Sequence, residues 1–464
     1  MSRTFFLAWN KKKSIRTPYA AFFRSRRIGA LLLALALAFP ACALALPEGG
    51  QISAGSGNIG QSGTTLTVTQ TSPKLAINWQ GFSIGQSETV TFRQPSSSAI
   101  ALNRVFGQNP SQILGGLNAN GQVFVLNPNG VLFGSTAQVN VGGLVASSLN
   151  LSDADFLAGN YIFSNSSKAG SVLNQGTLSA VNGGYIALLA PEVRNEGVLV
   201  ATLGTALLAA GDKVTLTLNN GSLLSYAIDQ GALNTLVENK HLIQADGGQV
   251  ILSAKSADLL TSSVVNNTGI IEARTIQNQG GVIKLLGDMH TGQVNVGGTL
   301  DASAPNGGDG GFVETSAAHV TVVPGSKITT HAPQGTSGNW LIDPADYTIA
   351  AAGGDITGFD LAFNLGNTNV TILSSQGTVN PAGNGDIFVY DAVSWNSANS
   401  LTLSAVRDIN VNSAITNGGT GAINLNAAAA VAVNADLGTM GAIAITAPTG
   451  LTQDVEPVEK LNSL

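Results

Sequence analysis

Short runs in which apolar and polar residues alternate one by one recur along the chain. Three clear examples are Thr65–Thr69, Thr89–Phe92 and Val214–Leu218. A period of two places alternate side chains on one face, which is the pattern of a β-strand with one buried face. Turn-forming Gly, Asn, Ser and Pro bound the runs, and no helical period persists beyond about two turns. The pattern therefore predicts a chain of many short strands.

The runs also resemble one another at a regular spacing. Val172–Ala180 (VLNQGTLSA) returns 21 residues later as Val193–Ala201 (VRNEGVLVA), and a paired-glycine turn before an apolar strand begins at Asn182, Asp246 and Gln279. A repeat of about 20 to 22 residues with three short strands is typical of a solenoid in which each coil packs on the next. We therefore predict an all-β fold, a right-handed parallel β-helix with an N-terminal cap, and about 20 coils if the repeat is uniform. The alternative is an array of antiparallel β-sandwiches, but these use more aromatic core residues.

Composition supports strands and turns over other classes of protein. Of 464 residues, 56 are glycine, 44% are hydrophobic and only 10% are charged. This hydrophobic content excludes a charge-rich disordered chain, and the glycines lack the three-residue period of collagen. The low charge also argues against the long charged helix faces of ordinary helical or α/β enzymes.

The charged residues are unevenly distributed. Residues 1–45 hold eight of the 21 basic residues and none of the 27 acidic ones, so the rest of the chain has a net charge of −14. The apolar run Ile28–Ala38 is too short for a lasting membrane span and precedes small-residue cleavage sites. We expect residues 1–45 to be an extended signal peptide, cut between Ala45 and Leu46. The cut removes Cys42, the only cysteine, and the acidic remainder is not expected to bind nucleic acid.

Between residue 46 and about residue 165 the repeat gives way to a series of specific motifs. In order, they are LPEGG (Leu46–Gly50), INWQGFSIG (Ile77–Gly85), VTF (Val90–Phe92), ALNRV (Ala101–Val105), NANGQVFVLNPNGVLFG (Asn118–Gly134) and VNVGGLVAS (Val139–Ser147). Together they resemble the secretion domain of two-partner secretion exoproteins, the filamentous haemagglutinin family. Phe6–Lys11 resembles the extended signal region of such proteins, and Gly338–Pro344 is similar to a segment that often follows the domain.

The run Asn127, Pro128, Asn129 and Gly130 is the secretion motif that the resemblance identifies. Asn, Pro and Gly at the first, second and fourth positions suit a type I turn, while Asn at the third position also tolerates type II. The resemblance implies that the motif is needed for secretion, either by contacting the transporter or by shaping the domain that does so, with the structural role favoured. A second Asn-Pro motif of some relatives is not evident, and Asn109–Ser111 is only a poor candidate for it.

The resemblance implies a division of the chain and a set of partners. We expect a β-helical secretion domain at residues 46–330, with residues 46–165 as its family-specific part, and β-helical repeats at residues 338–464 that are a truncated or N-terminal part of a longer exoprotein. The implied transporter is an outer-membrane β-barrel with periplasmic domains, so passage through membranes is transient and the product is secreted by, or displayed on, a Gram-negative cell. The implied role is adhesion or haemagglutination through a receptor on a host-cell or bacterial surface. The alternative within the family is the stalk of a cytolysin or contact-dependent toxin.

Chemistry-bearing residues are sparse, so we expect no enzyme activity, cofactor or metal. Some β-helices degrade polysaccharides with clustered carboxylates, which makes an enzyme the main rival. The candidate pairs are Asp153 with Asp155 and Asp343 with Asp346, and solvated turns explain both better. Asn306–Gly311 resembles a calcium-binding repeat but occurs once. The histidines, which show no metal-ligand spacing, are His241, His290, His319 and His331.

Overall fold

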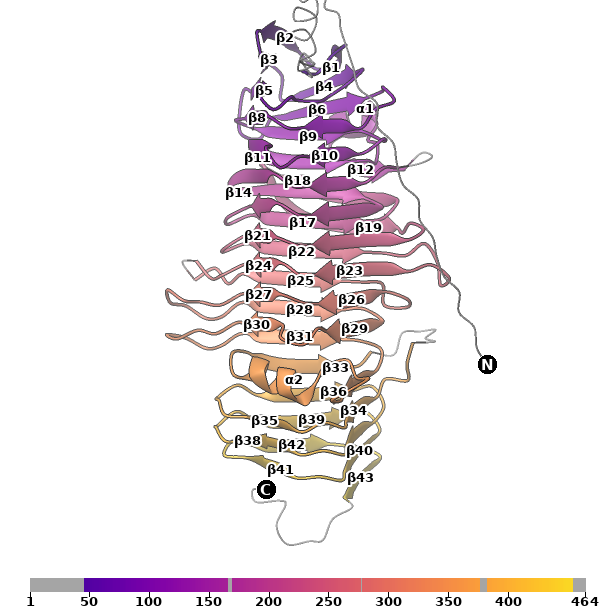
Figure 1. Ribbon diagram of the computed structural model, residues 1–464, viewed down its shortest axis with the longest axis vertical. Helices are drawn as coiled ribbons and strands as arrows, with labels where there is room; N and C mark the ends of the chain where they lie inside the picture. Colours follow the sequence, from indigo (N-terminus) through magenta and orange to yellow (C-terminus); the bar gives the residue numbers. More distant parts are fainter. Residues whose placement is uncertain (1–45, 166–168, 277, 376–381, 454–464) are drawn as a thin grey trace, which may run out of the picture. The chain divides into compact units, whose positions relative to one another are not determined.

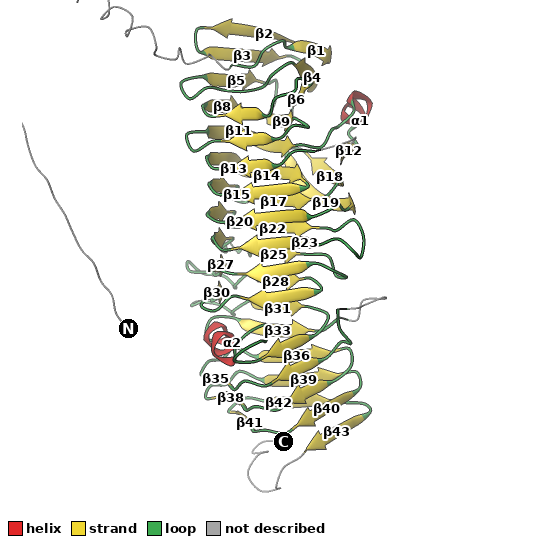
Figure 2. Ribbon diagram, turned by 45° about the vertical axis from the view of Figure 1, so that its right-hand side comes forward, coloured by secondary structure: helices red, strands yellow, loops and turns green. Residues whose placement is uncertain are grey.

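Strands from successive turns of the chain lie side by side and parallel, so the predicted fold class, a parallel β-helix, is confirmed (Figures 1 and 2). The computed structural model describes residues 46–165, 169–276, 278–375 and 382–453. Antiparallel pairs of strands are confined to the N-terminal strands and to one small sheet within these ranges. The sandwich alternative, which needs antiparallel pairing throughout, is therefore wrong.

The largest sheet of the described residues has 24 strands. They are β1 (Gln51–Ala54), β2 (Gly57–Ser62), β3 (Thr65–Gln70), β4 (Lys74–Trp79), β5 (Thr89–Arg93), β6 (Ile100–Val105), β8 (Gly116–Ala119), β9 (Gln122–Leu126), β11 (Gln138–Ser147), β14 (Thr177–Ala190), β16 (Val198–Val200), β17 (Thr205–Ala210), β21 (Leu242–Gln244), β22 (Gln249–Ala254), β24 (Ile270–Glu272), β25 (Val282–Leu286), β27 (Thr299–Asp301), β28 (Phe312–Ser316), β30 (Lys327–Thr329), β31 (Asn339–Asp343), β33 (Asn369–Leu373), β36 (Leu401–Ala405), β39 (Ile423–Ala427) and β42 (Ile443–Thr446).

Four smaller sheets and two helices complete the described fold. One sheet has β7 (Ser111–Ile113), β10 (Val131–Phe133), β13 (Val172–Asn174), β15 (Glu192–Asn195), β20 (Thr235–Asn239), β23 (Ser263–Asn267), β26 (Gln293–Val296) and β29 (His319–Val322). A second has β12 (Tyr161–Ser164), β18 (Lys213–Asn219) and β19 (Ser222–Gln230). The others have β32 (Tyr347–Ile349), β34 (Ile387–Val389), β37 (Ile409–Val411), β40 (Ala430–Val433) and β43 (Gly450–Gln453), and β35 (Val393–Trp395), β38 (Ile415–Asn417) and β41 (Leu437–Thr439). The helices are α1 (Asp153–Ala158) and α2 (Gly358–Leu365).

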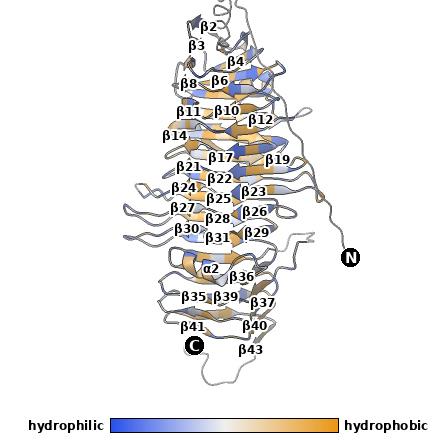
Figure 3. Cartoon of the chain, viewed as in Figure 1, coloured by the Kyte–Doolittle hydropathy of each residue, from blue (hydrophilic) through white to orange (hydrophobic). Residues whose placement is uncertain are grey.

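Identical apolar positions stack from coil to coil and form the core. One such column is fully buried and consists of Leu178, Leu199, Ile243, Ile271, Leu300 and Ile328, each paired in register with the next. Hydrophobic residues accordingly run along the strands of the largest sheet, interspersed with hydrophilic ones (Figure 3). The alternation read from the sequence therefore places one set of side chains inside the coils.

Buried asparagines stack in the same way at one corner. The side-chain amide of Asn174 donates to the side-chain oxygen of Asn195 at 2.8 Å, Asn195 donates to Asn239 at 2.8 Å, and Asn239 donates to Asn267 at 2.7 Å. All four residues are buried. The ladder satisfies polar groups that would otherwise be costly to bury, and it fixes the register between coils.

The coils are longer and fewer than a uniform repeat predicts. In register, Leu178 pairs with Leu199, 21 residues on, but Leu199 pairs with Ile243 because β18 and β19 are inserted between them. One continuous ladder of the largest sheet, from β4 to β42, holds 14 strands rather than about 20. Insertions at the corners account for the difference.

Two strand arrangements change along the described coils. At the N-terminal end, β1 pairs antiparallel with β4 and β2 with β3, and Ile59 of β2 packs on the core. Near Gly338, the eight-stranded sheet ends at β29 and the sheet that begins with β32 takes over. The ladder of the largest sheet continues through this point from β28 to β31 and β33. The division at residues 330–338 stays a prediction.

A column of glycines occupies one corner of successive coils. A Cβ atom built on Gly184 would lie 2.1 Å from the carbonyl oxygen of Gly142, one on Gly204 would lie 1.9 Å from that of Gly184, and one on Gly248 would lie 2.1 Å from that of Gly204. Each distance is far below van der Waals contact, so any side chain at these corners would push neighbouring coils apart. Much of the glycine excess therefore reflects close approach between coils.

We predict that Gly204→Ala destabilises the protein by about 1–3 kcal/mol through overpacking at this corner. The matched control is Gly60→Ala, because a Cβ atom on Gly60 has no other atom within 4 Å and its φ is not positive. Urea unfolding followed by circular dichroism measures both variants. Equal midpoints for the two variants would show that the corner tolerates a side chain.

Candidate functional site

The motif Asn127–Gly130 forms the tight corner between β9 and β10. The Gly130 backbone N–H donates to the Asn127 carbonyl oxygen at 2.9 Å, which closes a four-residue turn with Pro128 at its second position. Asn129 is not among the non-glycine residues with positive φ, so the turn is type I and the type II alternative is wrong. Gly130 has a φ of 107°, and a Cβ atom there would lie 2.8 Å from the Ser171 carbonyl oxygen.

The Asn127 side chain joins this corner to the preceding coil. It is fully buried, and its amide nitrogen donates to the Asn109 carbonyl oxygen and to the Ser111 hydroxyl, both at 3.0 Å. Its side-chain oxygen accepts from the Asn129 backbone N–H at 2.9 Å. The segment Asn109–Ser111, a poor candidate for a second motif, is thus a hydrogen-bonding partner of the first.

The next coil binds the corner from the other side. The Gly170 N–H donates to the Pro128 carbonyl oxygen at 2.8 Å, and the Val131 N–H donates to the Ser171 carbonyl oxygen at 3.0 Å. Of the four motif residues only Asn129 is exposed, and its amide donates to the Gly107 carbonyl oxygen at 2.9 Å. This geometry supports a structural role for most of the motif.

Elements outside the coils cover the outer face of the largest sheet beside this corner. We call α1, β12, β18 and β19 the cover. With the strands beneath it, the cover forms a second apolar cluster, separate from the core inside the coils. Its buried members are Ala76, Ile100, Leu102, Phe124, Leu126, Val145, Leu149, Leu151, Phe156, Tyr161, Phe163, Tyr185, Ala187, Leu189, Leu207, Ala209, Val214, Leu216 and Ile251. The strands of the family-specific part that lie beneath the cover therefore bury apolar side chains on both faces, one inside the coils and one under the cover.

Asp153 and Asp155 both lie in the first turn of α1, and each has hydrogen-bonding partners there. The Arg104 guanidinium donates to an Asp153 carboxylate oxygen at 2.7 Å and to the Leu151 carbonyl oxygen at 2.5 Å. The Ser152 hydroxyl caps the helix by accepting from the Asp155 backbone N–H at 3.0 Å, and it donates to the Asp155 carboxylate at 2.6 Å. Both carboxylates have partners at the first turn, where negative charge is favourable.

Lys74 holds the other end of α1. Its ammonium donates to the carbonyl oxygens of Phe156 and Leu157 at 2.8 and 3.0 Å, and it lies 5.7 Å and 5.5 Å from the ring centroids of Phe156 and Tyr161. A cation at a helix C-terminus satisfies carbonyl groups that lack partners within the helix. Burial lowers the pKa of Lys74. Sequence reasoning missed Lys74 and Arg104, although a lone basic residue within an otherwise apolar strand is a usable signal.

Asp343 and Asp346, the second carboxylate pair, also accept hydrogen bonds from neighbouring residues. Asp343 accepts from the Ser375 hydroxyl at 2.5 Å, and burial raises its pKa. One oxygen of Asp346 accepts instead from the backbone N–H groups of Asn384, Gly385 and Asp386, at 2.8, 2.7 and 2.8 Å. Asp346 therefore closes a loop, and the two carboxylates have separate partners.

Side chains that could bind a metal ion do not cluster in the part of the chain that the structure describes. No group of three or more His, Cys, Asp or Glu side chains suited to an ion occurs among those residues. In the glycine-rich segment Asn306–Gly311, an Asp309 carboxylate oxygen accepts from the backbone N–H and the hydroxyl of Thr336 at 2.8 and 2.5 Å. Thr336 thereby lowers the pKa of Asp309.

The cleavage point has only one described residue. Leu46 is buried against the first coils, whereas Ala45 lies outside the described residues. Cleavage between them stays a prediction. Among the described residues no helix is long and apolar enough to cross a membrane.

We predict that Asn127→Ala loosens the motif corner more than Asn129→Ala does. The first change removes the bonds to the Asn109 carbonyl oxygen and to the buried Ser111 hydroxyl and destabilises by about 1–3 kcal/mol, while the second removes the more exposed bond to the Gly107 carbonyl oxygen and costs less. Hydrogen–deuterium exchange should rise in residues 107–111 and 169–171 for Asn127→Ala. Equal exchange in the two variants would contradict the structural role given to Asn127.

Comparison with solved structures supports the fold. The HMW1 secretion domain from Haemophilus influenzae superposes with a TM-score of 0.59 at 22% identity, covering 88% of this chain and 100% of that one. At this identity the likeness shows a shared β-helical fold.

Comparison with known sequences shows the family. A heme/hemopexin-binding protein of Haemophilus influenzae strain Rd is 34% identical over 251 residues, which are 52% of this chain and 27% of the relative. A second Haemophilus influenzae protein of that name is 34% identical over 244 residues, 48% of this chain and 26% of its own length. The chain thus spans about a quarter of the length of these relatives.

The model of the TPS, or two-partner secretion, domain family matches residues 43–302, which is more than half of the chain. The match contains the motif corner, the cover and the strands beneath it. Proteins with this domain pass through the periplasm and reach the cell surface or the medium. The resemblance seen in the motifs is therefore confirmed, and the chain belongs to the TPS secretion domain family of two-partner secretion exoproteins.

Proposed function

We propose that the region up to residue 302 is the export signal of an adhesin, read by an outer-membrane β-barrel transporter with periplasmic domains. The family match over residues 43–302 carries this proposal. The later coils then present side chains to a receptor on a host-cell or bacterial surface. Their stacked strands expose polar columns such as Asn424 on Thr402 and Asn434 on Asn412, held by hydrogen bonds of 3.1 and 2.9 Å.

The coil architecture supports a passage driven by folding. Each coil gains its hydrogen bonds and its apolar burial from the coil before it, as in other nearest-neighbour solenoids. A chain that emerges unfolded at the cell surface adds one coil after another to the part already folded, and the folding free energy opposes backsliding. Because residues 46–464 contain no cysteine, no disulfide can lock the chain before it emerges.

A second candidate function is capture of haem or hemopexin. The names of the two relatives, each 34% identical to this chain, are the observation that favours it. A toxin stalk is a third possibility within the family.

The carboxylates that an enzyme would use, Asp153, Asp155, Asp343 and Asp346, are all held in structural hydrogen bonds. Because these hydrogen bonds engage the carboxylates in structural contacts, they favour a binding role for the chain over a catalytic one.

Deleting residues 46–165 should abolish release of the chain into the medium from cells that also make the transporter. The deletion removes the motif corner, α1 and the first coils, so the transporter has no signal to read. Immunoblots of periplasm and medium measure the distribution of the chain. The control deletion removes the terminal coils at residues 401–446 and should leave export intact; continued release of the 46–165 deletion would refute the proposal.

The purified secreted chain should bind erythrocytes or epithelial cells in a saturable way, leave the absorption spectrum of added hemin unchanged and retain no hemopexin. A hemin spectral shift or hemopexin capture without cell binding would instead select the second candidate. Incubation with polymers of uronic acids tests the enzyme alternative, and we expect no turnover.

A further inference from the structure

An open groove of about 550 Å³ lies on the surface of the first coils. It extends over three coils, because β5, β8 and β11 pair in register and each contributes to its lining. Neighbouring strands are about 4.8 Å apart, so the lining spans about 10 Å along the stack, roughly the length of two sugar rings. The residues that line this groove are Thr91, Phe92, Arg93, Gln94, Asn118, Ala119, Asn120 and Asn140.

One side of the groove is a column of small polar side chains. Thr91 pairs in register with Asn118, and Asn118 with Asn140. The Asn140 amide reaches the Asn118 side-chain oxygen at 3.4 Å, which is long for a hydrogen bond. The column therefore presents amides and a hydroxyl whose hydrogen-bonding capacity is largely free for a ligand.

The other side of the groove is held rigid by Asn120 and Gln94. The Asn120 side-chain oxygen accepts from the Gln94 backbone N–H at 2.7 Å, and its amide donates to the Gln94 carbonyl oxygen at 2.8 Å. The buried Gln94 side-chain amide donates in turn to the Gln70 side-chain oxygen at 3.1 Å and to the Ala99 carbonyl oxygen at 2.9 Å. A wall that is fixed before binding reduces the entropy lost when a ligand enters.

A free guanidinium lies at this groove. Arg93 is exposed, and its side chain has neither an ion pair nor a hydrogen bond in the part of the chain that the structure describes. Each of the other described arginines, Arg104, Arg194, Arg274 and Arg407, has a carboxylate partner. A guanidinium can bind one carboxylate through two parallel hydrogen bonds, so the Arg93 groove has a place for one acidic group.

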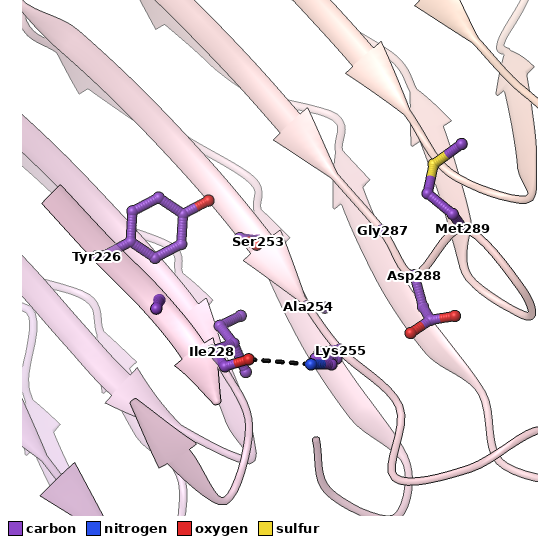
Figure 4. Close-up of a pocket in the computed structure, with 9 residues that line it drawn as sticks. Tyr226, Ile228, Ser253, Ala254, Lys255, Gly287, Asp288 and Met289 are labelled. Carbon is purple, nitrogen blue, oxygen red and sulfur yellow. Dashed lines mark hydrogen bonds between the residues drawn. The ribbon is translucent and has the colours of Figure 1, made fainter. Parts of the chain in front are cut away.

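The hollow beside β19 has no comparable cation. It has a volume of about 340 Å³ and is lined in part by Lys255, whose ammonium donates to the Ile228 carbonyl oxygen at 3.2 Å (Figure 4). Asp288 also lines that hollow, so an anion there would meet a carboxylate. The residues that line the Arg93 groove include neither Asp nor Glu. The Arg93 groove is therefore the better site for an anionic ligand.

The position of the Arg93 groove favours a sugar over a peptide or a nucleic acid. It crosses β5, β8 and β11, which are paired on both sides, so a peptide strand has no free edge to join there. Nucleic acid is disfavoured by the net charge of −14 after residue 45. Sugar hydroxyls both donate and accept hydrogen bonds, as the side chains of Thr91 and Asn118 do.

We propose that the Arg93 groove binds a mainly neutral oligosaccharide that carries one carboxylated sugar. Arg93 pairs with the carboxylate, while Thr91, Asn118 and Asn140 bond to hydroxyl groups. A densely charged polyanion is a poor ligand, because the acidic chain repels it. The groove forms only when three coils have folded, so on the proposed export route its ligand lies outside the cell. The inference rests on the proposed adhesin function and places one contact within the secretion-domain match.

The test measures binding of the secreted, folded chain to an oligosaccharide array. Neutral members of the array are paired with counterparts that carry one glucuronic, galacturonic or N-acetylneuraminic acid, and we expect only the carboxylated members to bind. Arg93→Gln should weaken this binding roughly tenfold or more, because a charge-assisted pair is lost. Arg93→Lys should restore part of it, since an ammonium lacks the planar fork. The matched control is Lys327→Gln, which removes an equal charge from an exposed position outside the groove.

Asn118→Asp gives a second test that leaves Arg93 in place. The new carboxylate repels the acidic sugar, so binding should fall again, whereas Asn424→Asp on a polar column of the later coils should leave it unchanged. Circular dichroism checks that each variant is folded.

The outcomes separate the groove from the adhesin function. The groove inference is wrong if the natural chain binds cells but no carboxylated member of the array, if neutral counterparts bind equally well, or if a folded Arg93→Gln variant binds the array as the natural chain does. If the natural chain binds no cells, the proposed adhesin function itself fails.

Discussion

Pairing between successive coils is the interaction on which the whole structure depends. A single coil of three short strands has neither its backbone partners nor an enclosed apolar interior until a neighbour lies against it. The in-register columns, such as Leu199 on Leu178 and Ile243 on Leu199, combine both requirements in one contact. Stability is therefore a property of neighbouring pairs of coils, and local order propagates along the chain.

Polar groups inside such a stack must be satisfied along its axis. The amides of Asn195 and Asn239 each donate to the next coil, and the Asn127 amide donates to the coil before it. The same rule explains how Asn127 of the motif can be fully buried. The motif corner forms hydrogen bonds with both the preceding and the following coil, so its conformation depends on the folding of three coils. The surface that a transporter would meet depends on the same contacts.

The alternation and the repeat in the sequence predicted the strands and their stacking, because both depend on residues that are close together in the chain. The alternation in Val214–Leu218 and the repeat shared by Val172–Ala180 and Val193–Ala201 correspond to observed strands. The number of coils was overestimated because insertions such as β18 and β19 lengthen a coil without disturbing its register. The cover was not foreseen, since its strands show the same alternation as those of the coils.

The contacts of the candidate site are long-range in sequence, which is why they escaped prediction. Lys74 binds a carbonyl 82 residues away, and Arg104 binds a carboxylate 49 residues away. No spacing rule connects such residues in a single sequence. The glycine column also limits what the surface can present, because a corner that cannot carry side chains cannot form a recognition surface. Side chains that could contact a partner must therefore lie elsewhere on these coils.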